Sequence, residues 1–325
     1  MNSKGLNSYE SFTTDPFNCK RYLIKKDNDT KSINSELLQD LGKTNMAHPK
    51  ILSDFITYGI KKYPAEKYIL IISDHGYAYS GICDDKTYDT WLKIDELKFA
   101  LEDAKKKTGK KLDILGFDAC YMANTETLYD MKNEADYIIA SSETENGKGW
   151  NYEKMLKDLN DNIKTDTDQV KISSLIVDSN KNNSAIKTLS VLDAKKTELL
   201  YSSLDELALS ILNSPNEIKN IKKMILNVRR YGNYEDLGEI CKFIVSGNVI
   251  KDDTMIISAK KVLEAMKITV IENHTHKEYS DSSGLSIDLP ENRLINISYR
   301  DLSMTKELKN WKNMISYIEK SFLDK

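Results

Sequence analysis

Two short segments of this sequence combine residue types that could carry out covalent catalysis. Residues 73–76 read SDHG and residues 117–120 read FDAC, so a histidine and a cysteine each follow an apolar run. A cysteine thiolate is a strong nucleophile, and a nearby imidazole can assist its formation or protonate a departing amine. His75 and Cys120 are therefore a candidate Cys/His pair for covalent catalysis.

The elements around these segments favour a fold that would bring them together. The runs at 68–72 and 112–117 are continuous and apolar, which is typical of strands buried on both faces of a parallel sheet. An amphipathic helix is expected at 94–104 and a third strand at 137–140. This alternation predicts an α/β fold, with a largely parallel sheet flanked by helices on both faces. Because ligands bind beyond the carboxyl ends of such strands, neighbouring strands would place the two segments side by side.

The chain divides into three parts by pattern. Residues 1–20 are polar and rich in turn formers, and we expect an N-terminal arm there. Residues 21–180 carry the alternation of strands and helices and are predicted to be the catalytic core. Residues 181–325 are more helical, and we expect them to pack on the same sheet. Their patterns predict helices at 189–212, 218–228 and 304–322 and strands at 268–271 and 284–288.

The composition is that of an ordinary folded protein and excludes several functions. Of the 325 residues, 40% are hydrophobic and 30% charged, which does not fit a disordered or low-complexity chain. The 47 basic and 50 acidic side chains leave a net charge of −3, so charge gives no reason to expect nucleic acid as a partner. No apolar stretch reaches the roughly 18 residues that a membrane span needs, and the first residues do not form a secretory signal peptide.

The cysteines are scattered along the chain. Cys19, Cys83, Cys120 and Cys241 form no CxxC pair and have no histidines at zinc-ligand spacing, so we expect neither a metal site nor a disulfide framework. Apart from Cys120, we expect inert thiols.

The residues around the Cys/His pair resemble the clostripain family of cysteine peptidases, bacterial relatives of caspases, gingipains and legumains. Caspases also place the histidine about 50 residues upstream of a Gln-Ala-Cys motif, where this chain has Asp-Ala-Cys. The resemblance is carried by SDHG (73–76), LGFDACYMANTETLYDM (115–131), ADYIIASSETENGKGWNYEKML (135–156) and, more faintly, by 189–200, 233–240 and 283–290. It implies a caspase-like α/β fold and a cysteine endopeptidase.

The resemblance also implies roles within the site. Cys120 matches the nucleophile that forms a thioester acyl-enzyme, and His75 matches the catalytic histidine. The backbone N–H groups of Gly76 and Cys120 would form the oxyanion hole. Asp118 matches the acid that selects Arg or Lys before the scissile bond, and Glu145 lies in a segment similar to the family's substrate-facing loop. Polypeptides with Arg or Lys at that position are the expected substrates.

Relatives in this family are often activated from a zymogen by self-cleavage in the loop after the histidine. Here we expect cleavage after Lys86, with Lys93 as the second choice. The sequence requires no cofactor. Some relatives depend on calcium, for which Asp84, Asp85 and Asp89 could supply oxygen ligands, although that is a match of composition only. The resemblance further implies a secreted or cell-envelope location.

Several alternatives stay open at this level. The same fold could be a catalytically inactive domain that binds peptides or acts as a scaffold. Asp118 could instead cap a helix expected at 122–132, and Trp150 could line the cleft or pack in the core. Family members usually begin with an apolar strand that has no counterpart before Arg21, so that strand has been trimmed away or the sheet lacks it. The oligomeric state is not predicted.

Overall fold

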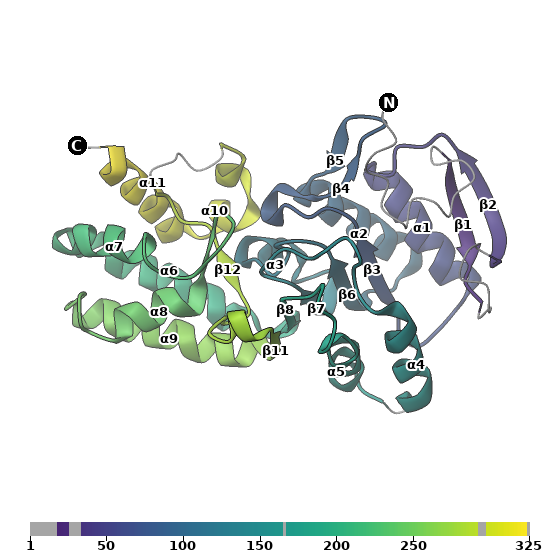
Figure 1. Ribbon diagram of the computed structural model, residues 1–325. Helices are drawn as coiled ribbons and strands as arrows, with labels where there is room; N and C mark the ends of the chain where they lie inside the picture. The colour runs from purple at the N-terminus through teal and green to yellow at the C-terminus, as the bar shows by residue number, and fades with distance from the viewer. Residues whose placement is uncertain (1–17, 26–33, 165–166, 292–296, 324–325) are drawn as a thin grey trace, which may run out of the picture.

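The computed structural model describes residues 18–25, 34–164, 167–291 and 297–323 (Figure 1). The elements are, in chain order, β1 (Cys19–Leu23), β2 (Glu36–Gly42), α1 (Pro49–Lys62), β3 (Ile69–Ser73), η2 (Ala78–Ser80), β4 (Ile82–Asp85), β5 (Thr90–Leu92), α2 (Ile94–Thr108), β6 (Leu112–Asp118), α3 (Thr125–Met131), β7 (Ala135–Ala140), α4 (Tyr152–Asn162), α5 (Gln169–Asn180), β8 (Thr188–Asp193), η3 (Ala194–Lys196), α6 (Glu198–Leu212), η4 (Pro215–Glu217), α7 (Ile218–Ile225), β9 (Arg230–Tyr231), β10 (Tyr234–Asp236), α8 (Leu237–Val245), α9 (Asp253–Thr269), β11 (Val270–Thr275), η5 (Lys277–Tyr279), β12 (Ser286–Ile287), η6 (Ile297–Asp301), α10 (Ser303–Glu307) and α11 (Lys309–Leu323). Most of the arm expected at 1–20 lies outside the described residues, and β1 begins within it.

A five-stranded sheet in the order β11-β8-β7-β6-β3 forms the centre of the protein. The strands β3, β6 and β7 are parallel neighbours, as the alternation of strands and helices predicts. The strands β8 and β11 join antiparallel, so the sheet is mixed rather than largely parallel. The α/β class is confirmed, and the parallel order is limited to the strands of the predicted catalytic core.

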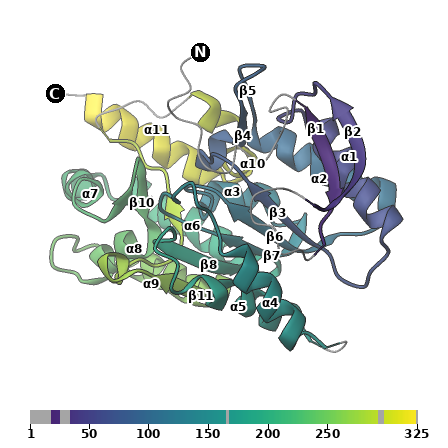
Figure 2. The same ribbon diagram turned by 45° about the vertical axis from the view of Figure 1, so that its right-hand side comes forward.

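Alternating side chains along the strands divide the core into two layers. Leu115 and Phe117 of β6 pack in the larger layer, which also holds buried residues of α1, α2, α6, α9 and α11. Ile114 of the same strand packs on the opposite face with Met155 of α4 and Ile176 of α5. This two-residue period is that of a strand covered on both faces. The helices α4 and α5 lie together, away from α1 and α2 (Figures 1 and 2).

The first strand of the sheet is less buried than predicted. β3 lies at the edge of the described sheet, with β6 as its neighbour, and its Leu70 and Ile72 are buried while Ile69 and Ser73 are exposed. An apolar run indicates that a strand has covered faces, but it does not report how many neighbours the strand has. Both faces of β3 are covered in its middle, with Leu70 and Ile72 in the larger layer and Ile71 partly buried against the other, but the ends of this edge strand are exposed.

Two helices that support the catalytic core follow local sequence signals. α1 begins at Pro49, whose fixed φ suits the first helical position. α2 covers the helix predicted at 94–104 and continues to Thr108, where Gly109 takes a left-handed conformation with φ 69 and ends it. These caps fix the positions of the helices that cover β3 and β6.

The helix predicted at 189–212 is wrong in its first part. Residues 188–193 form the buried strand β8 between β7 and β11, and α6 begins only at Glu198. A short apolar run fits a buried strand and a buried helix equally well, which explains the error. The helix predicted at 304–322 is likewise divided, because Leu308 separates α10 from α11.

The two late strands have different places. The strand expected at 268–271 is β11, which starts at Val270 after α9 and joins the central sheet. The strand expected at 284–288 is β12, which belongs to a small sheet in the order β12-β10-β9. An isolated bridge between Asn124 and Ser286 connects this small sheet to the segment that follows Cys120. Among the described helices, none has the length and apolar character needed to cross a membrane.

Candidate active site

The register of β3 against β6 brings the two candidate segments together. Ser73 is paired with Asp118 in this parallel ladder, so the residues after both strands leave the sheet at the same edge. There His75 and Cys120 line one pocket of about 190 Å³, together with Asp118 and Glu145. The expectation that the two strands are neighbours is confirmed.

The Cys120 thiol is held by the backbone of residue 145. The Glu145 N–H donates to Cys120 Sγ at 3.3 Å, and Sγ lies 3.6 Å from the Glu145 carbonyl oxygen, to which the thiol can donate. The other cysteines have different surroundings. Cys19 and Cys241 are buried, and burial raises the pKa of the Cys83 thiol to about 12. The thiol of Cys120 instead shares a pocket with His75.

Only glycine fits at position 76. A Cβ atom there would lie 2.4 Å from the Cys120 carbonyl oxygen and 3.1 Å from the Cys120 nitrogen. Within the described part of the chain, neither the Gly76 N–H nor the Cys120 N–H donates a hydrogen bond. Two backbone donors without partners therefore lie close together beside the pocket, which is what a developing oxyanion needs.

The chain after His75 folds back against the residues that carry the imidazole. The Cys83 N–H donates to the His75 carbonyl oxygen at 3.0 Å, at the start of the β4–β5 hairpin. The described non-glycine residues with positive φ are Ala78, Cys83, Asp89 and Tyr121. Each such residue costs on the order of 1–3 kcal/mol, and such residues cluster at functional sites. Backbone strain is thus confined to the segments that follow His75 and Cys120.

Lys86 occupies the turn of the β4–β5 hairpin. Its side chain is 78% exposed, and its Nζ pairs with Asp84 Oδ2 at 2.9 Å. The next aspartate, Asp85, accepts the N–H groups of Thr87 and Tyr88 within the same turn. Lys86 is therefore accessible, but in a closed turn rather than an extended segment.

The aspartates of this hairpin do not fit a calcium ion. The carboxylate of Asp84 is engaged by Lys86 and that of Asp85 by backbone N–H groups, which leaves no open set of three aspartates as oxygen ligands. Across the described ranges, no group of three or more His, Cys, Asp or Glu residues is arranged to hold a metal ion. No step at this site is therefore derived through calcium.

Asp118 lies at the base of the pocket and is 5% exposed. Its Oδ2 accepts from the Ser73 hydroxyl at 3.0 Å and from the Tyr152 hydroxyl at 2.7 Å. Its Oδ1 accepts from the Trp150 N–H at 3.2 Å. At Gly149 a Cβ would lie 2.6 Å from Asp118 Oδ2, so glycine lets the backbone close over the carboxylate.

The alternative role of Asp118 as a helix cap is wrong. α3 begins at Thr125 rather than at 122, and its cap is Asn124, whose Oδ1 accepts from the Thr127 N–H at 3.2 Å. The residues between Cys120 and α3 instead run beside residues 141–143, where the Ala123 N–H donates to the Ser141 carbonyl oxygen.

Glu145 is the second carboxyl group of the pocket. Burial and the neighbouring Asp118 hold the pKa of Glu145 well above its usual value. Its Oε1 accepts from the Trp150 indole N–H at 3.5 Å, while its Oε2 is buried and receives no hydrogen bond from the described residues.

Trp150 is packed in the core and also lines the depression beside the candidate site. It is 2% exposed, and its ring fills the space beside Gly116, where a Cβ would approach the indole to 3.0 Å. A second pocket of about 700 Å³ shares Asp118 with the first and is lined by residues 147–150 and by Tyr152. The segments after β6 and β7 and the start of α4 thus enclose a continuous depression beside Cys120.

Tyr234 of β10 contacts both candidate segments, and the faint resemblance at 233–240 assigns it no role. Its hydroxyl donates to the Tyr77 carbonyl oxygen at 3.2 Å, in the loop after His75. Its ring lies edge-on to Tyr121, which follows Cys120, with ring centroids 5.7 Å apart. Tyr152 and Ser73 were missed as well, because their role depends on the register of the sheet and not on a motif.

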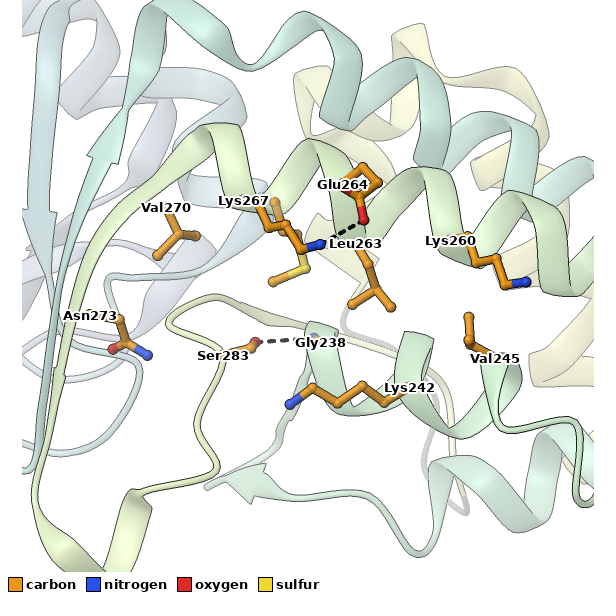
Figure 3. Close-up of a pocket in the computed structure, with 11 residues that line it drawn as sticks. Gly238, Lys242, Val245, Lys260, Leu263, Glu264, Lys267, Val270, Asn273 and Ser283 are labelled. Carbon is orange, nitrogen blue, oxygen red and sulfur yellow. Dashed lines mark hydrogen bonds and ion pairs between the residues drawn. The ribbon is translucent and has the colours of Figure 1, made fainter.

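A further groove lies far along the chain from these residues, between α8 and α9 (Figure 3). It has a volume of about 610 Å³, an apolar floor that includes Leu263 and Val270, and lysines at its rim such as Lys242 and Lys260. Figure 3 shows Lys267 turned toward Glu264, with which it pairs at 2.7 Å. The residues that line this groove include neither cysteine nor histidine, so the nucleophilic chemistry belongs to the pocket at Cys120.

Comparison with known proteins gives a consistent relationship. A family model described as the clostripain family matches residues 16–319 of this chain. Clostripain of Hathewaya histolytica is 27% identical over 234 residues, which are 60% of this chain and 43% of clostripain. The chain therefore matches less than half of the length of that curated relative.

Solved structures show the same fold at low identity. A secreted C11 cysteine protease from Bacteroides thetaiotaomicron, in complex with an irreversible peptide inhibitor, has a TM-score of 0.66 and 19% identity, covering 92% of this chain and 87% of that one. An inactive zymogen C11 protease from Parabacteroides distasonis has a TM-score of 0.64 and 22% identity, covering 86% of this chain and 82% of that one.

Proposed function

This chain belongs to the clostripain family of cysteine peptidases, and on that premise we propose that it is an endopeptidase that cuts polypeptides after Arg or Lys through Cys120 and His75. The observation that carries this proposal is the pairing of Ser73 with Asp118, which delivers the thiol and the imidazole to one pocket. The two N–H groups without partners at Gly76 and Cys120 support it.

The pocket's residues account for each step of the proposed reaction. Cys120 gives its proton to His75, and the thiolate attacks the scissile carbonyl carbon while the carbonyl π electrons move to the oxygen. The N–H groups of Gly76 and Cys120 stabilise that oxygen. Breakdown of the intermediate expels the amine, which takes the proton from His75, and leaves a thioester on Cys120. Water then loses a proton to His75, hydrolyses the thioester and restores the thiol.

The preference for a basic residue rests on the carboxyl pair Asp118 and Glu145. Both line the pocket that holds Cys120, so the side chain before the scissile bond would enter beside them. A cation there is favoured by charge complementarity in a site with little water. A Lys or Arg side chain, but not an acidic one, suits this pocket.

Fluorogenic peptides with Lys, Arg or Asp before the scissile bond test the proposal. We expect turnover of the basic peptides only, no turnover by Cys120→Ala, and unchanged turnover by the matched control Cys19→Ala. Circular dichroism should show that all three proteins are folded. Turnover of the Asp peptide at the same rate, or activity of Cys120→Ala, would contradict the proposal. A folded protein that binds basic peptides without cutting them would instead be the inactive binding domain.

We propose that activation includes self-cleavage after Lys86, with Lys93 as the second site. The exposure of Lys86 in the hairpin that follows His75 supports this, and the β4–β5 turn must open for the cut to occur. Intact mass before and after incubation should show two fragments for the active chain and one intact chain for Cys120→Ala. Hydrolysis of substrate by a chain that stays intact would show that activity does not require self-cleavage.

We propose a secreted or cell-envelope location, since a similar solved structure is of a secreted C11 protease. Polypeptides are the expected partners. Immunodetection in culture medium, envelope and cytoplasmic fractions tests the location, and detection in the cytoplasm alone would contradict it.

A further inference from the structure

We propose that the groove between α8 and α9 is an exosite, a second binding site for the polypeptide substrate, and that it takes a substrate segment with both acidic and apolar side chains. The proposal rests on the proposed function, because it assigns this second site to the substrate that Cys120 is proposed to cut. Its residues take no part in the chemical step.

The floor of the groove is apolar and only partly buried. Val245 of α8, Leu263 of α9 and Val270 of β11 pack against the core and also line the groove. A volume of about 610 Å³ is enough for several side chains of a peptide. Partly exposed apolar surface with a charged border is typical of a site that binds a partner.

The charges at the rim favour an acidic occupant. Lys242, Lys260 and Lys267 line the groove, and Glu264 is the one acid among its described lining residues. Lys242 of α8 lies across the groove from Lys267 of α9 (Figure 3). The chain as a whole has a net charge of −3, so this excess of positive charge is local. Carboxylates of a bound segment would therefore meet ammonium groups from both helices.

The ion pairs that two of these lysines already make do not prevent this. Lys267 pairs with Glu264, and Lys242 pairs with Glu239, each within its own helix. The lysine side chains are 69% and 54% exposed, and exposed pairs of this kind contribute little to stability. Both lysines can therefore turn toward a ligand at small cost.

The groove lies within reach of a substrate held at Cys120. Ser283, which lines the groove, comes three residues before Ser286, whose N–H donates to the Ala123 carbonyl oxygen at 2.9 Å. Ala123 in turn follows Cys120 by three residues. Because an extended residue spans at most about 3.6 Å, these two short segments place Ser283 within about 27 Å of Cys120. About eight extended residues of a substrate cover that distance.

Kinetics with peptides of two lengths test the proposal. A short fluorogenic lysine peptide is compared with peptides that extend it, before or after the scissile bond, through a flexible linker of about 8–12 residues to a segment of alternating Glu and Leu. We expect one of these extensions to raise kcat/KM about tenfold through a lower KM. About 0.5 M salt should remove most of this gain, and an extension with Gln in place of Glu should give clearly less.

Charge reversal in the groove supplies the variant. Lys242→Glu combined with Lys260→Glu should abolish the gain from the acidic extension and leave turnover of the short peptide unchanged. The matched control is Lys261→Glu, next along α9, whose side chain pairs with Glu206 of α6 instead. It should keep the gain, and circular dichroism should show that all the proteins are folded. No gain from either extension, or a gain that survives the double charge reversal, would overturn the inference.

Binding separates failure of this inference from failure of the proposed function. If the wild-type protein cuts none of the peptides, the proposed function fails, and fluorescence anisotropy of a labelled Glu/Leu segment then tests the groove alone. Binding that the double charge reversal abolishes would support the groove as the site for an acidic segment, and no binding would overturn it. Sedimentation that shows a dimer broken by the same two changes would also overturn it, because a second copy of this chain would then occupy the groove.

Discussion

Two carboxyl pairs with similar chemistry serve different ends in this protein. Asp118 and Glu145 lie at the catalytic edge of the sheet, and Glu126 and Asp288 lie in the core, where both are at most 1% exposed. In each pair burial and the neighbouring acid raise the pKa of the glutamate, for Glu126 to about 8. In each, one glutamate oxygen receives no hydrogen bond from the described residues.

The core pair joins the catalytic half to the C-terminal half. Tyr79, in the loop after His75, donates its hydroxyl to Asp288, which follows β12. Glu126 of α3 accepts from the Asp288 N–H at 3.1 Å and from the Tyr299 hydroxyl at 2.8 Å. The hydrogen bond from Tyr79 thus connects the loop after His75 to a residue 209 positions later in the chain.

The difference between the pairs is the space beside them. The pair at the sheet edge lines a pocket with a nucleophile, whereas the core pair is enclosed by packed side chains. An unpaired buried oxygen is therefore evidence for a ligand only where a cavity adjoins it. The following predictions sharpen or break that distinction, from the largest expected effect to the smallest.

The largest effect is expected from truncating the core pair. Glu126→Ala removes the acceptor of the Tyr299 O–H and of the Asp288 N–H and leaves both of these buried donors without an acceptor, although the Tyr299 oxygen still accepts from the Trp311 indole N–H. We therefore expect a loss of about 3 kcal/mol or more in the free energy of unfolding. Urea denaturation followed by circular dichroism measures it. Glu145→Ala, in the pair that lines the pocket, should lower the free energy of unfolding clearly less. Equal losses in the two variants would show that the two pairs do not differ.

The core pair should also make stability depend on pH. The pKa of Glu126 is raised in the folded protein, so its contribution is full below about pH 4.5, its unfolded value, and is lost as pH rises toward about 8. Relative to Glu126→Gln, the free energy of unfolding should fall by up to about 1.4 kcal/mol per pH unit in that range. Urea midpoints at several pH values measure this slope, and parallel curves for the two proteins would contradict it.

The contact of Tyr234 with both catalytic segments predicts a kinetic effect. Tyr234→Ala removes the ring beside Tyr121 and the hydrogen bond to the Tyr77 carbonyl, so His75 and Cys120 are held less accurately. We expect kcat to fall about tenfold with KM little changed, and Tyr234→Phe, which keeps the ring, to lose less. A fall in thermal stability without a change in kcat would show that Tyr234 has a structural role only.

The smallest effect concerns the choice between two cations. Asp118 accepts from Ser73, Tyr152 and the Trp150 N–H, which leaves about one of its lone-pair positions open and suits the ammonium of Lys better than the two-pronged guanidinium of Arg. We expect kcat/KM to be a few-fold higher for a Lys peptide than for the matched Arg peptide, roughly 1 kcal/mol or less. A clear preference for Arg would indicate that a donor to Asp118 moves aside.

The sequence predicts the parts of the site that depend on local pattern. The apolar runs locate β3, β6 and β7, and the residues after the first two contain His75 and Cys120. Gly76 was expected from its lack of a side chain, and the close approach to Cys120 agrees with this.

Other parts depend on long-range register, which one sequence does not display. The sequence pattern does not distinguish the strand β8 from a helix, because its six residues are uniformly buried and show no alternation. Tyr152, Ser73 and Tyr234 act through partners on other elements, so no spacing marks them. The hydrogen bonds that Asp118 accepts are visible only once these donors are in place.

Labelling of Cys120 tests the central claim most directly. Wild-type protein is incubated with peptidyl acyloxymethyl ketones that carry either lysine or norleucine, and the adduct is located by peptide mapping with mass spectrometry. The account predicts one adduct, on Cys120, formed much faster by the lysine reagent, and none in Cys120→Ala. Equal rates for the two reagents, or an adduct on Cys19, Cys83 or Cys241 instead, would contradict it.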